Sequence, residues 1–143
     1  MRILTSLLTV SLTLFGCQPK SSPPPPADAS GAAPSIVDRE WALASLGDNL
    51  APVGNGGNPV TLTLQSSDHR AFGNAGCNRY SGPYRLTGDQ LTFGPAISTE
   101  MACEEGTDVE NAFLAMLPAV TSYVATDSSL TLVGDGGSLA RFR

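Results

Sequence analysis

The stretch FGNAGCNRYSGPY, Phe72 to Tyr84, places a cysteine among small residues and follows it at once with Asn, Arg and Tyr. Its glycines at 73, 76 and 82 predict bulges, turns or close approaches between two backbone segments. We therefore interpret the stretch as a glycine-rich strand-and-turn segment. The first question that it raises is whether Cys77 is a nucleophile, a metal ligand or one half of a disulfide.

Cysteine usage along the chain favours the disulfide. The chain has three cysteines, an odd number for an exported protein. Cys17 ends the sequence LFGC, Leu14 to Cys17, which resembles the lipobox of bacterial lipoproteins, where the cysteine is acylated. Lipidation of Cys17 leaves Cys77 and Cys103 as an even pair, which an oxidising compartment usually joins. Free buried thiols and a reactive thiol are the alternatives.

Catalytic and metal-binding roles for Cys77 lack supporting residues. A nucleophilic thiol needs a lowered pKa and a nearby base, whereas His69, the only histidine, lies in the hydrophilic run SSDHR. Zinc sites need four ligands, usually with C-x₂-C spacing, which the chain lacks. Adjacent acids such as Glu104 and Glu105 diverge in most backbones. We predict no catalytic residue, metal or cofactor; an enzyme using Cys77 or a carboxylate pair is the alternative.

The N-terminus has the pattern of an export signal. Met1 and Arg2 precede an apolar run, Ile3 to Phe15, that is too short to span a bilayer of roughly 30 Å. We predict a lipoprotein signal peptide over residues 1–16 and lipidation at Cys17, with ordinary secretion and cleavage elsewhere as the alternative. By resemblance to lipoprotein sorting, Gln18 after the cysteine implies the outer membrane, facing the periplasm.

Residues 17–35 are predicted to be a tether. They are rich in Pro, Ser and Ala and carry no apolar periodicity, so they cannot bury enough surface to fold. A proline-rich recognition motif is the alternative. The remaining residues, 36–143, suit one domain. The chain carries eight basic and thirteen acidic residues without a basic cluster. This balance argues against a nucleic-acid partner, and we expect a monomer.

Periodicity predicts an α+β domain. Val60, Leu62 and Leu64 alternate with polar residues, as in a half-buried strand. Further strands are expected at 39–47, 69–76, 79–86, 91–94, 120–126, 130–134 and 138–142, and loops at 47–59, 87–90 and 135–137. Turn signals about every eight residues indicate an antiparallel meander. We predict a curved sheet or open barrel of about seven or eight short strands.

One helix is expected within GTDVENAFLAMLP, Gly106 to Pro118. Thr107 and Glu110 have the spacing of a capping box at its start. The predicted core-facing stripe consists of Val109, Ala112, Phe113, Met116 and Leu117. Pro118 is expected to end or kink the helix.

Several motifs occur in the order of one known family. They are WAL at Trp41, GNAGCNRYSGPY at Gly73, LTF at Leu91, STEMAC at Ser98 and ENAFLAML at Glu110, followed by Tyr123 to Leu132. In this order they resemble the META domain, the family that includes the heat-shock protein HslJ. The resemblance covers residues 36–143. It implies an α+β fold with an antiparallel sheet and one helix, a bacterial envelope location, and an association with heat response and antibiotic tolerance. It implies no catalytic residues.

One cluster of the motif is a candidate interaction patch. Asn78, Arg79, Tyr80 and Glu100 concentrate polar groups beside the predicted disulfide. For each of them we favour a purely structural role, and the interaction patch is the alternative hypothesis. We predict a non-enzymatic lipoprotein that contacts the membrane through its lipid and possesses an envelope protein partner. The alternative function is an inhibitor or chaperone-like partner of a periplasmic enzyme.

Overall fold

The fold is built from short strands separated by turns, as the alternating sequence predicts. The computed structural model describes residues 35–50 and 52–143. Its strands are β1 (Glu40–Leu46), β2 (Asn49–Leu50), β3 (Thr61–Gln65), β4 (Arg70–Asn74), β5 (Arg79–Thr87), β6 (Gln90–Phe93), β7 (Ile97–Ser98), β8 (Ser122–Thr126), β9 (Ser129–Gly134) and β10 (Gly137–Phe142). Its helical segments are η1 (Asn55–Gly57), α1 (Thr107–Met116) and η2 (Leu117–Ala119).

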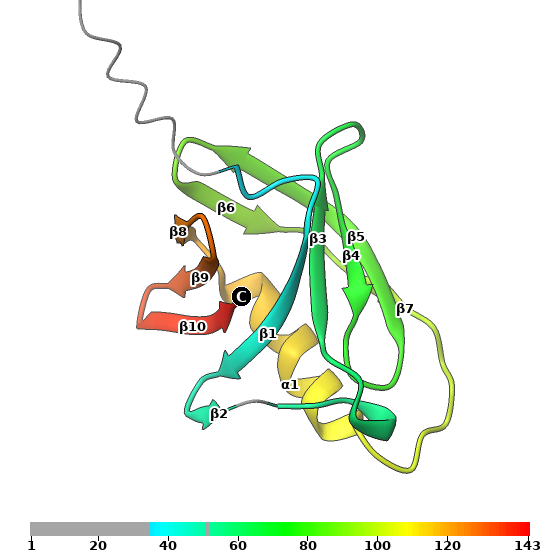
Figure 1. The fold of residues 1–143 in the computed structure, drawn as a ribbon. Helices are drawn as coiled ribbons and strands as arrows, with labels where there is room; N and C mark the ends of the chain where they lie inside the picture. Colours follow the sequence, from blue (N-terminus) through cyan, green and yellow to red (C-terminus); the bar gives the residue numbers. More distant parts are fainter. Residues whose placement is uncertain (1–34, 51) are drawn as a thin grey trace, which may run out of the picture. The chain divides into compact units, whose positions relative to one another are not determined.

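The strands close into an antiparallel barrel. Neighbours follow the order β10-β9-β8-β6-β5-β4-β3-β1-β2, and β10 also pairs with β1 (Figure 1). The first half of β1 pairs with β3 and the second half with β10. Eight strands therefore form the ring, and β2 and β7 are additions to it. The prediction of an α+β fold with an antiparallel sheet is confirmed; the barrel is closed rather than open.

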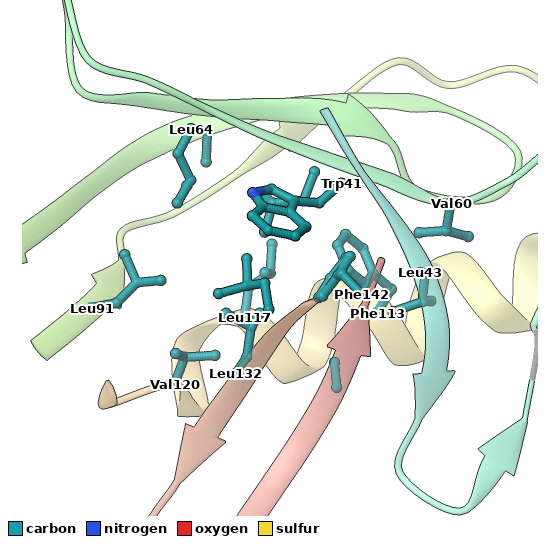
Figure 2. Packing of buried hydrophobic residues seen from close by; sticks show 14 of the residues in the cluster. Trp41, Leu43, Val60, Leu64, Leu91, Phe113, Leu117, Val120, Leu132 and Phe142 are labelled. Atoms are coloured by element: carbon teal, nitrogen blue, oxygen red, sulfur yellow. The ribbon is translucent and has the colours of Figure 1, made fainter. Parts of the chain in front are cut away.

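Helix α1 packs its apolar side chains into the core of the barrel. Between β6 and β8 one residue pair is formed, Gln90 with Ser122. Phe113 of α1 is fully buried, with its ring centroid 5.3 Å from that of Tyr80 and 6.4 Å from that of Phe142. Figure 2 shows Phe113 and Leu117 entering the core beside Trp41 and Leu132. Helix α1 thus contributes Phe113 to the core beside β5 and β10, and η2 lies against β6, whose pairing with β8 is short.

The core itself gathers the inward-facing residues of every long strand. Trp41, Leu62 and Leu64 are fully buried, as their alternation predicts. The Trp41 indole N–H donates to the Ile36 carbonyl at 3.0 Å, which satisfies its polar group. The Arg39 guanidinium lies over the Trp41 ring, 4.0 Å from its centroid, in a cation–π contact.

The structure corrects three local predictions. The expected loop 47–59 contains the short strand β2 and the turn η1, and β7 forms where no strand was expected. Ala112, placed in the apolar stripe, is exposed. The end of the α-helix at Met116, two residues before Pro118, is confirmed, and Pro118 itself lies in the tighter turn η2 that follows. Such two- or three-residue elements depend on tertiary pairing, which periodicity does not encode.

The N-terminal predictions concern residues that the structure does not describe. The signal peptide over 1–16, Cys17 and the tether up to residue 34 lie outside the described residues. Among residues 35–50 and 52–143, helices are all too short or too polar to traverse a bilayer.

Candidate functional site

The predicted disulfide is present in the structure. Cys77, in the turn between β4 and β5, is bonded to Cys103, and their Cα atoms lie 5.8 Å apart. Cys103 belongs to the segment that runs from β7 to α1. The bond therefore joins the β4–β5 turn to the approach of the helix. Because the sulfur of Cys77 is in a disulfide, it has no thiol to act as nucleophile or zinc ligand.

Glu110 of α1 points toward the place where the β4–β5 turn meets the start of the helix, which we call the junction. It is only 7% exposed. Its Oε2 accepts the backbone N–H of Cys77 at 3.0 Å and also that of Asn78. Its Oε1 accepts the Asn78 side-chain N–H at 3.1 Å. One carboxylate thus holds the helix against the β4–β5 turn with charge-assisted hydrogen bonds, which are stronger than neutral ones.

This use of Glu110 makes the predicted capping box wrong. The N-cap residue is Gly106 in left-handed conformation, and it makes no side-chain capping hydrogen bond. Thr107 and Glu110 have the correct spacing, but the Glu110 carboxylate is occupied by Cys77 and Asn78 instead. A carboxylate on the first helical turn still suits the positive end of the helix dipole.

Asn78 connects Glu110 to the segment after β7. Its side chain is 6% exposed. The Asn78 Oδ1 accepts the Thr99 hydroxyl at 2.9 Å and the Met101 backbone N–H at 2.8 Å. Since its N–H group donates to Glu110, both ends of the amide are bonded within the domain. Asn78 is a structural residue and offers no side chain to an external partner.

Tyr80 is also buried, with 3% of its side chain exposed. Its hydroxyl donates to the Thr61 carbonyl at 3.1 Å, and burial raises the pKa of the phenol. Strand alternation explains this position, because β5 turns Tyr80 inward and Arg79 outward. The predicted patch is therefore corrected: Arg79 and Glu100 are exposed, whereas Asn78 and Tyr80 belong to the interior.

Glycine is required where the loops of the junction meet. Gly76 has φ of 143°, and a Cβ built on it would lie 2.5 Å from the Gly106 carbonyl oxygen. A Cβ on Gly106, with φ of 85°, would lie 2.6 Å from the Asn55 backbone nitrogen. Asn55 in turn donates to the Gly76 carbonyl at 2.9 Å. The turn η1, the β4–β5 turn and the start of α1 are thus in backbone contact.

The interior of this junction is fully satisfied. Within the described residues every buried side-chain nitrogen or oxygen has a hydrogen-bond partner. In the same part of the chain, His, Cys, Asp and Glu residues form no group of three or more suited to a metal ion. The junction organises the fold, and its outer surface is the part that remains open to partners.

The surface around Arg79 is hollowed. Phe72, Arg79 and Ile97 belong to the lining of a depression of about 420 Å³ over β4, β5 and β7. A smaller depression of about 230 Å³ adjoins it, sharing Phe72 and Arg79 and reaching Glu40 on β1. Arg79 is the one outward-facing residue of the Asn-Arg-Tyr run. Polar and apolar side chains therefore meet around Arg79.

A third depression lies at the other end of β4. It measures about 730 Å³ and includes His69, Tyr84 and Arg85 in its lining. The His69 and Tyr84 ring centroids are 5.8 Å apart. His69 precedes β4 and Cys77 follows it, so the strand separates the only histidine from the disulfide.

The fold and the junction define a class of protein: a small antiparallel barrel with one helix, joined by a disulfide next to a buried glutamate. The META domain profile matches residues 34–143. The chain belongs to the META domain family.

Solved structures share this fold. A protein from Burkholderia xenovorans with an NMR structure is 31% identical, with a TM-score of 0.62; the match covers 83% of this chain and 96% of that one. A second protein with an NMR structure is 25% identical, with a TM-score of 0.55 and coverage of 72% and 86%. A comparison with curated proteins found no match.

Proposed function

We propose that this chain is a lipid-anchored, non-enzymatic protein of the bacterial cell envelope whose META domain acts as a binding module. The Cys77–Cys103 disulfide carries the proposal. Disulfides persist in oxidising compartments outside the cytosol. With this pair joined, Cys17 is the remaining cysteine, and it directly follows the predicted export signal. An export route and a lipid anchor account for all three cysteines.

The binding role is supported by how the motif residues are used. Asn78, Tyr80 and Glu110 are all buried. Asn78 donates to Glu110, and Tyr80 donates to Thr61 of β3, so all three serve the framework. The neighbouring surface instead combines Arg79 with apolar side chains, a composition suited to recognition. The family resemblance adds a physiological setting, namely envelope or heat stress and antibiotic tolerance. Gln18 supports the periplasmic face of the outer membrane, with the protein acting as a monomer.

A more specific form of this role is an inhibitor or chaperone-like partner of a periplasmic enzyme. It is supported by apolar side chains that lie together at the surface: Ile97, which is 72% exposed, and Phe72 line the same depression. Such side chains commonly mark contacts with other proteins when they lie together. A native pull-down of the acylated protein, with a periplasmic enzyme recovered and inhibited or stabilised, is the supporting result.

Metabolic labelling with an alkyne analogue of palmitate tests the anchor. The full chain is expressed in a diderm bacterium beside a Cys17→Ala variant. We expect the label on the parent chain, its loss from the variant, and recovery of the parent in the outer-membrane fraction. Equal labelling of both chains, or release of the parent as a soluble protein, contradicts the proposal. Thiol titration before and after reduction checks in both chains that Cys77 and Cys103 remain bonded.

A further inference from the structure

The outer face of β4 and β5 differs in charge from the rest of the domain. Residues 36–143 contain six arginines and twelve acidic residues. Three of those arginines, Arg70, Arg79 and Arg85, lie on these two strands, and neither strand contains an acidic residue. All three are exposed. In an acidic domain this places half of the positive charge on one strand pair.

The spacing of the arginines follows the strands. Alternation turns Arg79 and Arg85 to the same face of β5, six residues apart, which is about 20 Å at the usual rise. Arg70 lies opposite Pro83, between them. The Arg70 guanidinium donates to the Ser81 hydroxyl at 2.7 Å. Because this hydroxyl is neutral, the contact does not compensate the positive charge of Arg70. The three cations form a row along one strand direction.

An apolar depression lies beside one end of this row. Phe72 and Ile97 line it next to Arg79, in a volume of about 420 Å³. Ile97 belongs to β7, and its pairing with Ser81 places it directly beside β5. A large exposed aliphatic side chain next to a cation favours a partner that offers an apolar group beside an anion.

The flanks of the row carry acidic residues. Glu40 lines the depression adjoining Arg79, and Asp68 lines the one near Arg85. These carboxylates disfavour a broad polyanion or a flat anionic membrane, whose charge would also cover the flanks. A single narrow chain that follows the strands avoids them. An extended peptide has the same rise per residue as β5, so its carboxylates match the spacing of the arginines.

We propose that the outer face of β4 and β5 binds an extended acidic peptide segment of an envelope protein. Carboxylates six residues apart lie on Arg79 and Arg85, another lies on Arg70, and a neighbouring apolar side chain enters the depression between Phe72 and Ile97. This inference deepens the proposed binding role, on which it rests, and it requires no lipid anchor.

Fluorescence anisotropy of labelled nonapeptides tests the proposal. The probe is Leu-Ser-Glu-Ser-Glu-Ser-Glu-Ser-Glu, whose leucine and glutamates share one face of the extended chain. Its first and last glutamates are six residues apart, and the matched peptide carries Gln in place of Glu. The protein is the full acylated chain in neutral detergent. We expect at least tenfold tighter binding of the acidic peptide, and weakening of about tenfold in Arg79→Gln and in Arg85→Gln.

Arg141→Gln is the matched control, because Arg141 is exposed on β10 and the variant has the same net charge. We expect it to bind the acidic peptide as the parent does. Equal binding of both peptides, or equal weakening in Arg141→Gln and Arg79→Gln, overturns the proposal. So does Arg79-dependent binding to phosphatidylglycerol vesicles without binding of the acidic peptide, which would identify a membrane surface instead.

Two further measurements separate the possible failures. Amide chemical shifts upon addition of the acidic peptide are expected to move on β4, β5 and β7 and not on β8 to β10; the reverse pattern contradicts the site. Unchanged melting temperatures of the arginine variants show that binding was lost without unfolding. Cys17→Ala is expected to keep peptide binding, so a failed lipid anchor and a failed peptide site give different results.

Discussion

Glu110 is the residue on which the junction around Cys77 depends. Its carboxylate accepts two backbone N–H groups from the β4–β5 turn and one from the Asn78 side chain. A buried donor without its acceptor costs roughly 1–3 kcal/mol, more than the bond itself contributes. Removing this one acceptor group therefore affects several donors together.

We expect Glu110→Ala to lower the free energy of unfolding by about 3 kcal/mol, because at least two buried donors lose their acceptor. Glu110→Gln preserves the shape but turns an amide donor toward other donors, so it is expected to destabilise as well. Urea titration followed by circular dichroism measures both. Glu105→Ala removes an exposed carboxylate nearby and should change stability by no more than about 0.5 kcal/mol. A neutral effect of Glu110→Ala contradicts the assigned role.

Because the phenol of Tyr80 is buried, we expect the domain to lose stability at alkaline pH. Burial raises the pKa of its phenol, so the folded state retains the proton above pH 10, where the unfolded chain loses it. More protons are then bound in the folded state, and the free energy of unfolding falls as pH rises. The expected slope is about 1.4 kcal/mol per pH unit from this one group. Below pH 10 the stabilisation is fully present.

Tyr80→Phe is the test of that slope. Loss of the hydrogen bond to Thr61 is expected to cost about 1 kcal/mol at pH 7. Between pH 9 and 11 the variant should lose stability less steeply than the parent. Some slope should remain, because burial, followed by the charges of Asp38 and Asp68, also raises the pKa of Tyr84. Identical slopes in urea titrations of the two chains would show that Tyr80 is not responsible.

At the residue scale the sequence was informative where chemistry is local. The number of cysteines predicted the pairing of Cys77 with Cys103, which the structure contains. The burial and hydrogen bonding of Asn78 and Glu110 were not predictable, because they depend on contacts between residues more than thirty positions apart. The only cue was spacing: Glu110 lies on the same helical face as Phe113 and Leu117, so it faces the core.

Among elements, the segment between β7 and α1 is held in two ways. The disulfide joins Cys103 to the β4–β5 turn. The amide of Asn78 binds Thr99 and Met101 of the same segment independently. The covalent bond restricts the unfolded chain, whereas the hydrogen bonds stabilise the folded one, so their effects on stability should be separable.

Cys77→Ala with Cys103→Ala is expected to lower the free energy of unfolding by roughly 3.5 kcal/mol, the chain-entropy value for a loop of about 27 residues. The variant should keep the barrel, because Glu110 and Asn78 still bond the same elements. Thermal unfolding with and without reductant measures the effect. Reductant should destabilise the parent by a similar amount and leave the double variant unchanged; destabilisation of both chains would contradict the explanation.

Elements with a clear hydrophobic periodicity were predictable from the sequence, and those that form only by pairing with another strand were not. The long strands β1, β3, β5 and β9 and the helix fall where alternation and the apolar stripe indicate. Strand β7 has two residues and exists because Ile97 and Ser98 pair with β5. Thr99, directly after this strand, donates its hydroxyl to the Asn78 Oδ1. No local sequence pattern predicts such a strand.

At the scale of the whole domain, closure depends on the last strand. The backbones of Ala42 and Arg143 exchange two hydrogen bonds of 2.9 Å, which join the two ends of the domain. Phe142 is 1% exposed and lies in the core beside Phe113 (Figure 2). Pairing of β1 with β10 is also the contact of greatest sequence separation, so the ring closes only when the whole domain is present.

Phe142→Ala therefore tests whether closure and core are one cooperative unit. Removing a buried phenylalanine usually costs 3–5 kcal/mol through lost burial and an unfilled cavity. We expect that loss in urea titration, with the same transition reported by circular dichroism and by Trp41 fluorescence, because Trp41 lies in the same core. Val124→Ala, on an exposed site of β8, should change stability by less than about 0.5 kcal/mol. If the β8–β10 strands instead lost hydrogen-exchange protection while β3–β5 stayed protected, closure would be separable from the core, and the barrel would comprise two folding units.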